Sequence, residues 1–203
     1  VNTAEELAAV KRIVVQNVAS SGHAVLNAAD PLVVDMAEHC PGSVIFFARD
    51  NLHHPVLATH HAQHKRVIYL QGQHIVASGE NGEHKIALKN IPLTQDGSIY
   101  FQIENAMAAI GAAWALGFDW KVIREGLSSF ISDSQTAPGR FNLFNYRNAT
   151  LIADYGHNPD AIQALVSAID NIPSKKRSVV ISAAGDRRDE DIRLQTRIIG
   201  DAF

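Results

Sequence analysis

The strongest indication of the fold class is the segment Leu151-Ile152-Ala153-Asp154-Tyr155-Gly156-His157-Asn158-Pro159-Asp160. Its apolar start predicts a buried strand, its polar middle a turn, and Pro159 the first position of a helix, where proline is favoured. The same order follows further along the chain, with a predicted strand over 177–183 and a helix over 189–203. Strands that alternate with helices predict a parallel sheet of the doubly wound type.

Polar side chains follow both predicted strands. In an open α/β sheet, ligands bind beyond the carboxyl ends of the strands. Asp154 is therefore a candidate for binding a ribose hydroxyl. Arg187 and Arg188 are candidates for binding a carboxylate or phosphate, which the planar guanidinium holds with two hydrogen bonds. The alternative is that Asp154 and Asp189 only cap helices and that the arginines are solvated.

The first half of the chain predicts a β/α layer followed by an antiparallel meander. Thr3 and Glu6 form a capping-box pattern at the start of a helix of about four turns, and Asp30-Pro31 starts a second helix. Turn residues separate the short apolar runs. The predicted strands are residues 23–26 and 43–48 in the layer, and 66–70, 74–77 and 84–88 in the meander.

Two helices are predicted next, over residues 104–116 and 120–129, and Gly117 caps the first of them. Gln102 and Asn105 flank its start, where their amides either read an adenine edge or cap the helix. The polar segment 132–139 ends in Pro-Gly and predicts a domain boundary, with one domain over 1–137 and the next over 138–203. Arg140 leaves this turn either toward a phosphate in the cleft or as an ordinary surface arginine.

Histidines gather in the segment 53–64, at positions 53, 54, 60, 61 and 64. His60 and His64 have the i, i+4 spacing of a helical zinc pair, but no glutamate follows His60 as the metalloprotease motif requires. The sequence around them reads as irregular and polar. We therefore expect a solvated loop and no metal.

Composition excludes several classes of partner. The net charge is -3 with a pI near 6.4, so no basic excess favours nucleic acid or an anionic membrane. No apolar run approaches the roughly 20 residues of a membrane span. Cys40 is the single cysteine, which excludes an internal disulfide and fits a cytoplasmic protein. The chain opens into one helix without an initiator methionine and stops inside another, so we expect it to be part of a longer protein.

Four segments, in this order, resemble the Mur ligase family. Residues 26–31 are similar to the Asn-Ala-Asp-Asp-Pro segment of the family's central domain, with Ala29 in place of an aspartate. Residues 102–109 resemble the helix start that flanks the adenine, and 138–141 the opening of the C-terminal domain. Residues 154–161 resemble the signature that usually reads Asp-Tyr-Ala-His-Asn-Pro. Residues 140–144 and 185–192 look like those of the cyanophycin synthetase branch.

The resemblance implies a fold and an activity. The fold would be α/β, the later part of a Mur ligase central, ATP-binding domain followed by an incomplete Rossmann-like C-terminal domain. Cyanophycin synthetases join arginine to the aspartyl side-chain carboxylates of poly-aspartate, through an acyl phosphate made with ATP and Mg²⁺. A separate ATP-grasp part of these enzymes adds the aspartates. The full-length enzyme would be a homo-oligomer.

The resemblance also implies residue roles. Gln102 and Asn105 would face the adenine, Asp154 the ribose, and Asn158 would lie near the nucleotide. The catalytic residues would be Arg140, on the nucleotide phosphates, and His157, near the reacting groups. The incoming amino acid would be bound by residues at three consecutive positions: Asp186, Arg187 and Arg188.

One feature of the family is missing from these residues. The chain contains no Gly-x-x-x-x-Gly-Lys-Ser/Thr phosphate loop, so the main triphosphate and Mg²⁺ site is expected upstream, and the chain alone is expected not to turn over. Two alternatives stay open. One is another Mur-type ligase, acting on peptidoglycan precursors or folylpolyglutamate. The other is a non-catalytic nucleotide-binding module.

Overall fold

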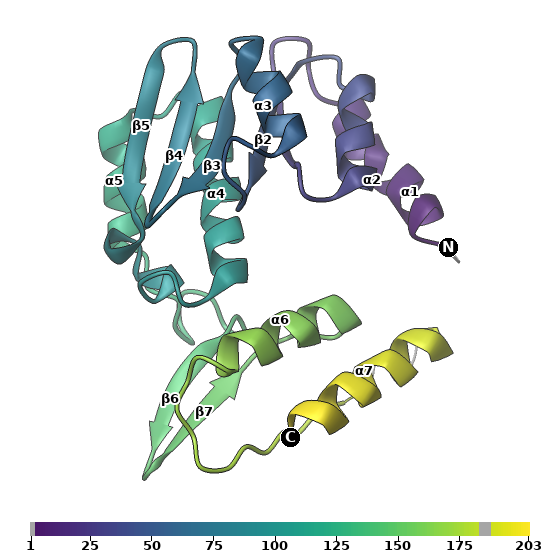
Figure 1. Cartoon of the computed structure of the whole chain (residues 1–203), viewed down its shortest axis with the longest axis vertical. Coiled ribbons are helices and arrows are strands. Elements are labelled where there is room, and N and C mark those ends of the chain that lie inside the picture. Colours follow the sequence, from purple (N-terminus) through teal and green to yellow (C-terminus); the bar gives the residue numbers. More distant parts are fainter. Residues whose placement is uncertain (1–2, 183–187) are drawn as a thin grey trace. The chain divides into compact units, whose positions relative to one another are not determined.

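The computed structural model describes residues 3–182 and 188–203 and shows an α/β protein (Figure 1). The chain divides into two compact units. The first consists of Val1–Gly97 and Phe101–Phe130, and the second of Ser98–Tyr100 and Ile131–Phe203. The predicted α/β class is confirmed.

A single five-stranded sheet, in the order β1-β2-β3-β4-β5, organises the first unit. The first three strands are parallel and the last three antiparallel, so β3 belongs to both patterns. The predicted β/α layer and meander are therefore both confirmed, and they share one sheet. The strands are β1 (His23–Asn27), β2 (Ser43–Ala48), β3 (Val67–Gln71), β4 (His74–Gly79) and β5 (Gly82–Ala87).

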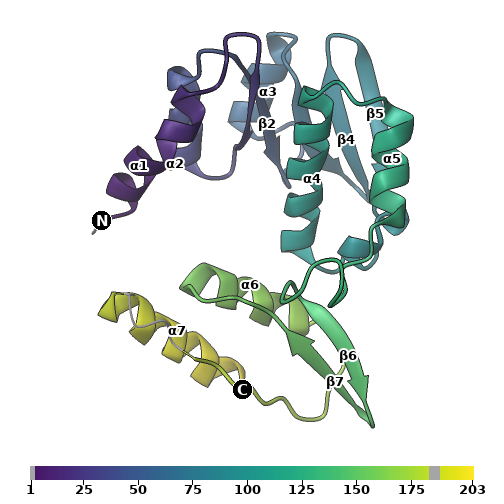
Figure 2. The ribbon, with the colours of Figure 1, turned by 180° about the vertical axis from the view of Figure 1, so that it is seen from behind.

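Helices cover both faces of this sheet, and alternate residues of β3 serve the two cores. Val67 and Tyr69 pack with Leu57 on the face of α1 and α3, whereas Ile68 packs with Met107 on the face of α4 and α5 (Figures 1 and 2). This two-residue alternation is the normal consequence of the pleat. The helices of the unit are α1 (Ala4–Gln16), α2 (Pro31–Val34), α3 (Pro55–Ala62), α4 (Tyr100–Ala115) and α5 (Trp120–Ser129), with short 3-10 turns at Asp35–His39, Leu88–Asn90 and Pro92–Thr94.

Two sequence predictions in this unit are wrong. The histidine segment is no irregular loop but contains the helix α3, because Pro55 occupies a favourable first position and Leu57 and His60 bury one face. The helix α4 begins at Tyr100, one turn earlier than predicted, since Gln102 and Ile103 are already buried in its first turn.

The second unit contains an antiparallel pair, β6 (Asn142–Tyr146) and β7 (Ala149–Ala153), followed by the helices α6 (Pro159–Ile169) and α7 (Asp189–Ala202), which pack together. The strand predicted over 177–183 is wrong for its described residues, 177–182, which pair with no strand in the part of the chain that the structure describes. Apolar β-branched residues favour a strand but form one only beside a hydrogen-bonding neighbour. The parallel sheet predicted for this part of the chain is therefore not seen in the described residues of the second unit.

Three residues interleave the two units along the chain. Ser98–Tyr100 groups with the second unit although both flanking segments belong to the first. The Nδ2 of Asn171, just beyond α6, donates a hydrogen bond of 3.0 Å to the carbonyl of Ser98. The chain thus passes from one unit to the other three times.

Candidate functional site

Asp154 directly follows β7 and joins two loops of the second unit. Its Oδ2 accepts a hydrogen bond from the Phe141 amide at 2.9 Å, and its Oδ1 accepts one from the Gly156 amide at 2.6 Å. The amide of Tyr155 also donates to the Gly139 carbonyl, at 2.8 Å. The carboxylate is exposed, and each of its oxygens has a second lone pair that a ligand hydroxyl can use.

The turn that presents Arg140 is built around a buried amide. The Asn142 side chain is 2% exposed, accepts a hydrogen bond from the Gly139 amide at 2.7 Å and donates one to the Ala137 carbonyl at 3.0 Å. Gly139 has φ +70°, which glycine adopts without strain. Arg140 is exposed, and its carbonyl accepts a hydrogen bond from Ser132. Its backbone is therefore fixed while its guanidinium faces solvent.

His157 and Asn158 follow Asp154 at the start of α6. The Nδ1–H of His157 donates to the Tyr155 carbonyl at 3.0 Å, because a carbonyl can only accept. In the neutral ring the lone pair then lies on Nε2, as a proton acceptor requires. Asn158 caps α6 through its Oδ1, which accepts from the Ala161 amide at 2.8 Å, and its Nδ2 remains a donor.

The structure thus brings four predicted residues of the second unit together on adjoining loops. Arg140 lies in the turn that Asp154 ties down, and His157 and Asn158 continue from Asp154 into α6. Positive partial charge at a helix N-terminus favours an anion there.

The two residues predicted to face the adenine, Gln102 and Asn105, lie in the first unit, in the first two turns of α4. The Nδ2 of Asn105 donates to the Oε1 of Gln102 at 3.0 Å, and Gln102 is 4% exposed whereas Asn105 is exposed. Between them, burial raises the pKa of Glu104, which the nearby Arg49 partly opposes. The two amides form one hydrogen-bonded pair near the start of α4.

Of the three residues predicted to bind the amino acid, the structure describes only Arg188. Asp186 and Arg187 lie outside the described residues. Arg188 holds Asp191 with two hydrogen bonds, from Nε at 3.0 Å and from Nη2 at 2.8 Å. The hydrogen bonds and charge of Asp191 raise the pKa of Arg188. In this structure its guanidinium therefore already has a carboxylate partner, within its own helix turn.

Two histidines of the segment 53–64 are hydrogen-bonded to neighbouring strands. The Nε2–H of His60 donates to the Val44 carbonyl at 2.9 Å, and its ring meets Phe46 edge-on. His61 is hydrogen-bonded to the hydroxyl of Ser78. Within residues 3–182 and 188–203, no three metal-ligating side chains come together. The helices of that same part of the chain include none with the length and apolarity for crossing a bilayer.

Sequence reasoning missed two residues of these sites. Asn142 lies within the segment 140–144, but nothing in its position revealed that it would be buried under the turn. Glu104 lies between the two predicted adenine residues, and a charged residue on an alanine-rich helix was the available signal.

Known proteins share parts of this sequence and its fold. The sequence model of the Mur ligase, glutamate ligase domain matches residues 139–202, which contain Arg140, Asp154, His157 and Asn158. Over these residues the chain is similar to the Mur ligases. The solved structure of a UDP-N-acetylmuramoyl-L-alanyl-D-glutamate–2,6-diaminopimelate ligase covers 99% of this chain with a TM-score of 0.56 and 21% identity, which supports the shared fold.

The predicted similarity to the cyanophycin synthetase branch is also supported. Over its whole length the chain is 35% identical to the cyanophycin synthetase of Geminocystis herdmanii and 36% identical to that of Crocosphaera subtropica. It spans 23% of the length of each of these proteins. The resemblance seen in the sequence is confirmed.

Proposed function

We propose that this chain is part of an ATP-dependent ligase that joins the α-amine of arginine to an aspartyl side-chain carboxylate of poly-aspartate. The observation that carries the proposal is the similarity of this whole chain to a segment of the cyanophycin synthetases. The arrangement of Arg140, Asp154 and His157 on adjoining loops supports it. ATP and free arginine are cytoplasmic metabolites, so we place the reaction in the cytoplasm.

In the proposed reaction, polar side chains bind the nucleotide. The amide pair of Gln102 and Asn105 offers a donor and an acceptor for the adenine edge. The remaining lone pairs of Asp154 accept from the ribose hydroxyls. The guanidinium of Arg140 and the Nδ2 of Asn158 contact phosphate oxygens, where charge is neutralised during transfer.

Two bond exchanges follow. A carboxylate oxygen of the acceptor attacks the γ-phosphorus of ATP, and the bond to ADP breaks, which leaves an acyl phosphate. The arginine α-amine then attacks the acyl carbon, and phosphate departs as the amide forms. We assign the lost amine proton to Nε2 of His157, because its Nδ1 is already a donor. We propose that Asp186, Arg187 and Arg188 bind the arginine, and Arg188 would have to release Asp191 first.

Mg²⁺ is implied by the family, but the described residues fit no such site, since no three ligating side chains meet. We therefore assign no residue of this chain to the metal and derive no step through it.

The test uses a chimera, because the relatives are about four times as long as this chain. These 203 residues replace the aligned segment of the Geminocystis herdmanii enzyme. Phosphate release is followed with ATP, Mg²⁺ and a short poly-aspartate acceptor, with and without arginine. The separate aspartate-adding reaction serves as the control for folding.

We expect arginine-dependent release, with arginine joined to the acceptor. If the chimera still adds aspartate but shows no arginine-dependent phosphate release, arginine is not the substrate. Phosphate release with another amino acid would support a different Mur-type ligase. No phosphate release with any amino acid would favour the non-catalytic nucleotide-binding module.

A further inference from the structure

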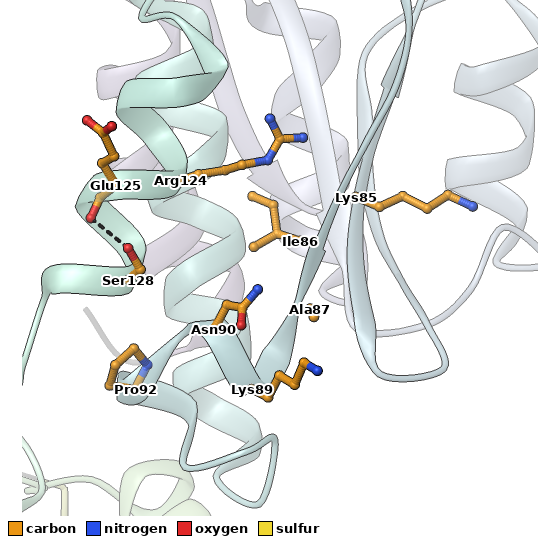
Figure 3. A pocket seen from close by; sticks show the side chains of 9 residues that line it. All are labelled: Lys85, Ile86, Ala87, Lys89, Asn90, Pro92, Arg124, Glu125 and Ser128. Atoms are coloured by element: carbon orange, nitrogen blue, oxygen red, sulfur yellow. Dashed lines mark hydrogen bonds between the residues drawn. The ribbon is translucent and has the colours of Figure 1, made fainter.

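The first unit contains a cavity of about 350 Å³ between β5 and α5 (Figure 3). Its walls come from the end of β5, the 3-10 turns that follow, and one face of α5. None of its lining residues belongs to the predicted nucleotide or amino-acid sites. The cavity therefore needs an explanation of its own.

Two cations of this cavity are available to a ligand. Arg124 extends from α5 across the opening toward β5, and Lys89 stands on the opposite wall, beside the amide of Asn90 (Figure 3). Both charged side chains are exposed. An arginine and a lysine on facing walls, with an amide between them, suit a carboxylate ligand.

The other charged side chains that line the cavity have partners outside it. Lys85 points away from the cavity (Figure 3), and its amine donates to Gln71 at 3.1 Å and lies 3.7 Å from Glu83. Among the described residues that line the cavity, Glu125 carries the one acidic side chain, which turns to the outer side of α5 and lies 4.0 Å from Lys121. The opening therefore carries an excess of positive charge, in a chain whose net charge is -3.

We infer that this cavity binds carboxylates of an acidic polypeptide, at a place distinct from the residues assigned to chemistry. The inference rests on the proposed function, which supplies a polymer with a carboxylate on every residue. A second contact on such a polymer raises the effective concentration of its remaining carboxylates. Long acceptors would then bind more tightly than short ones, with no change in the chemical step.

The test is binding of fluorescein-labelled poly-aspartate to the 203-residue chain at low ionic strength, measured by anisotropy. The variant K89Q/R124Q removes the positive charges of these two lining residues. The matched control, K175Q/K176Q, removes two exposed positive charges from the second unit. We expect about tenfold weaker binding for the first variant and less than about twofold for the control, since each exposed charge contact contributes little alone.

Equal weakening by both variants would show nonspecific attraction, and no weakening by K89Q/R124Q would show that the cavity is not used; either result overturns the inference. The chimera separates this failure from that of the proposed function. There, K89Q/R124Q should raise KM for long poly-aspartate about tenfold, leaving kcat and the KM for a short acceptor unchanged. If wild type and variant show equal arginine-dependent phosphate release at all acceptor lengths, the proposed function stands. Binding of the polymer's carboxylates in the cavity is then rejected.

Discussion

Gly111 of α4 allows a close approach of that helix to the sheet, and its substitution by alanine has a calculable result. A Cβ at this position would lie 2.6 Å from Cγ1 of Val25 on β1 and 3.4 Å from Cδ1 of Ile68. Val25 is β-branched and stiff, so the contact is relieved only by shifting the helix or the strand. Such overpacking costs about 1–3 kcal/mol. Alanine in a helix interior recovers about 1 kcal/mol relative to glycine.

Gly111→Ala should therefore lower the free energy of unfolding of the first unit by up to about 2 kcal/mol in the wild-type background. Val25→Ala removes the clashing methyl groups. In that background the same substitution should stabilise by up to about 1 kcal/mol, because only the helix preference remains. The sign of the effect changes between the two backgrounds.

Urea unfolding followed by tryptophan fluorescence measures this cycle. Both tryptophans, Trp114 and Trp120, belong to the first unit, so the signal reports that unit alone. If Gly111→Ala changes the stability by the same amount with Val25 and with Ala at position 25, the proposed clash is wrong.

Three further predictions concern the second unit and the histidine segment. Asn142→Ala should destabilise the second unit by about 2–3 kcal/mol, because it leaves the Gly139 amide without its acceptor; hydrogen exchange of that amide would reveal it, and unchanged protection would contradict it. Asp154→Asn should weaken ADP binding to the chimera at least about tenfold, and equal affinity would exclude a ribose contact. Burial lowers the pKa of His60, so its contribution to stability is present above about pH 6.5 and is lost as the pH falls through its folded value. His60→Gln should therefore make the urea midpoint less sensitive to pH between about 5 and 7, and an unchanged slope would assign the sensitivity to other groups.

Most of the first unit could be predicted because its signals are local. The capping of α1 by Thr3 and of α2 by Asp30 is written in adjacent residues, and the structure has both hydrogen bonds. The glycines of the meander mark its turns, of which Gly72 and Gly82 have positive φ. The joining of the meander to the β/α layer could not be predicted, since nothing in β3 alone shows that both of its edges are paired.

The errors have a common physical cause, which is that burial depends on distant partners. His60 counts as polar in a sequence pattern, yet the carbonyl of Val44 satisfies its ring and lets it lie inside. Conversely, Val180 belongs to an apolar run that predicts a strand, but its side chain is fully exposed.

In the candidate site too, local features could be predicted and contacts between distant residues could not. Asp154 was found because a strand end followed by a helix start is a local pattern. Its two backbone hydrogen bonds, to residues 141 and 156, were not foreseeable, because one of them spans thirteen positions of the chain. The same is true of the buried Asn142 beneath the turn.

The interleaving of Ser98–Tyr100 bears on how such proteins can recombine during evolution. A single crossover near residue 131 would transfer the C-terminal unit of one ancestor but leave these three residues with the other. The Ser98 carbonyl would then meet whatever side chain the donor carries at position 171. Inheritance of both units together avoids that mismatch, so functional hybrids should more often exchange the pair as a block than either half.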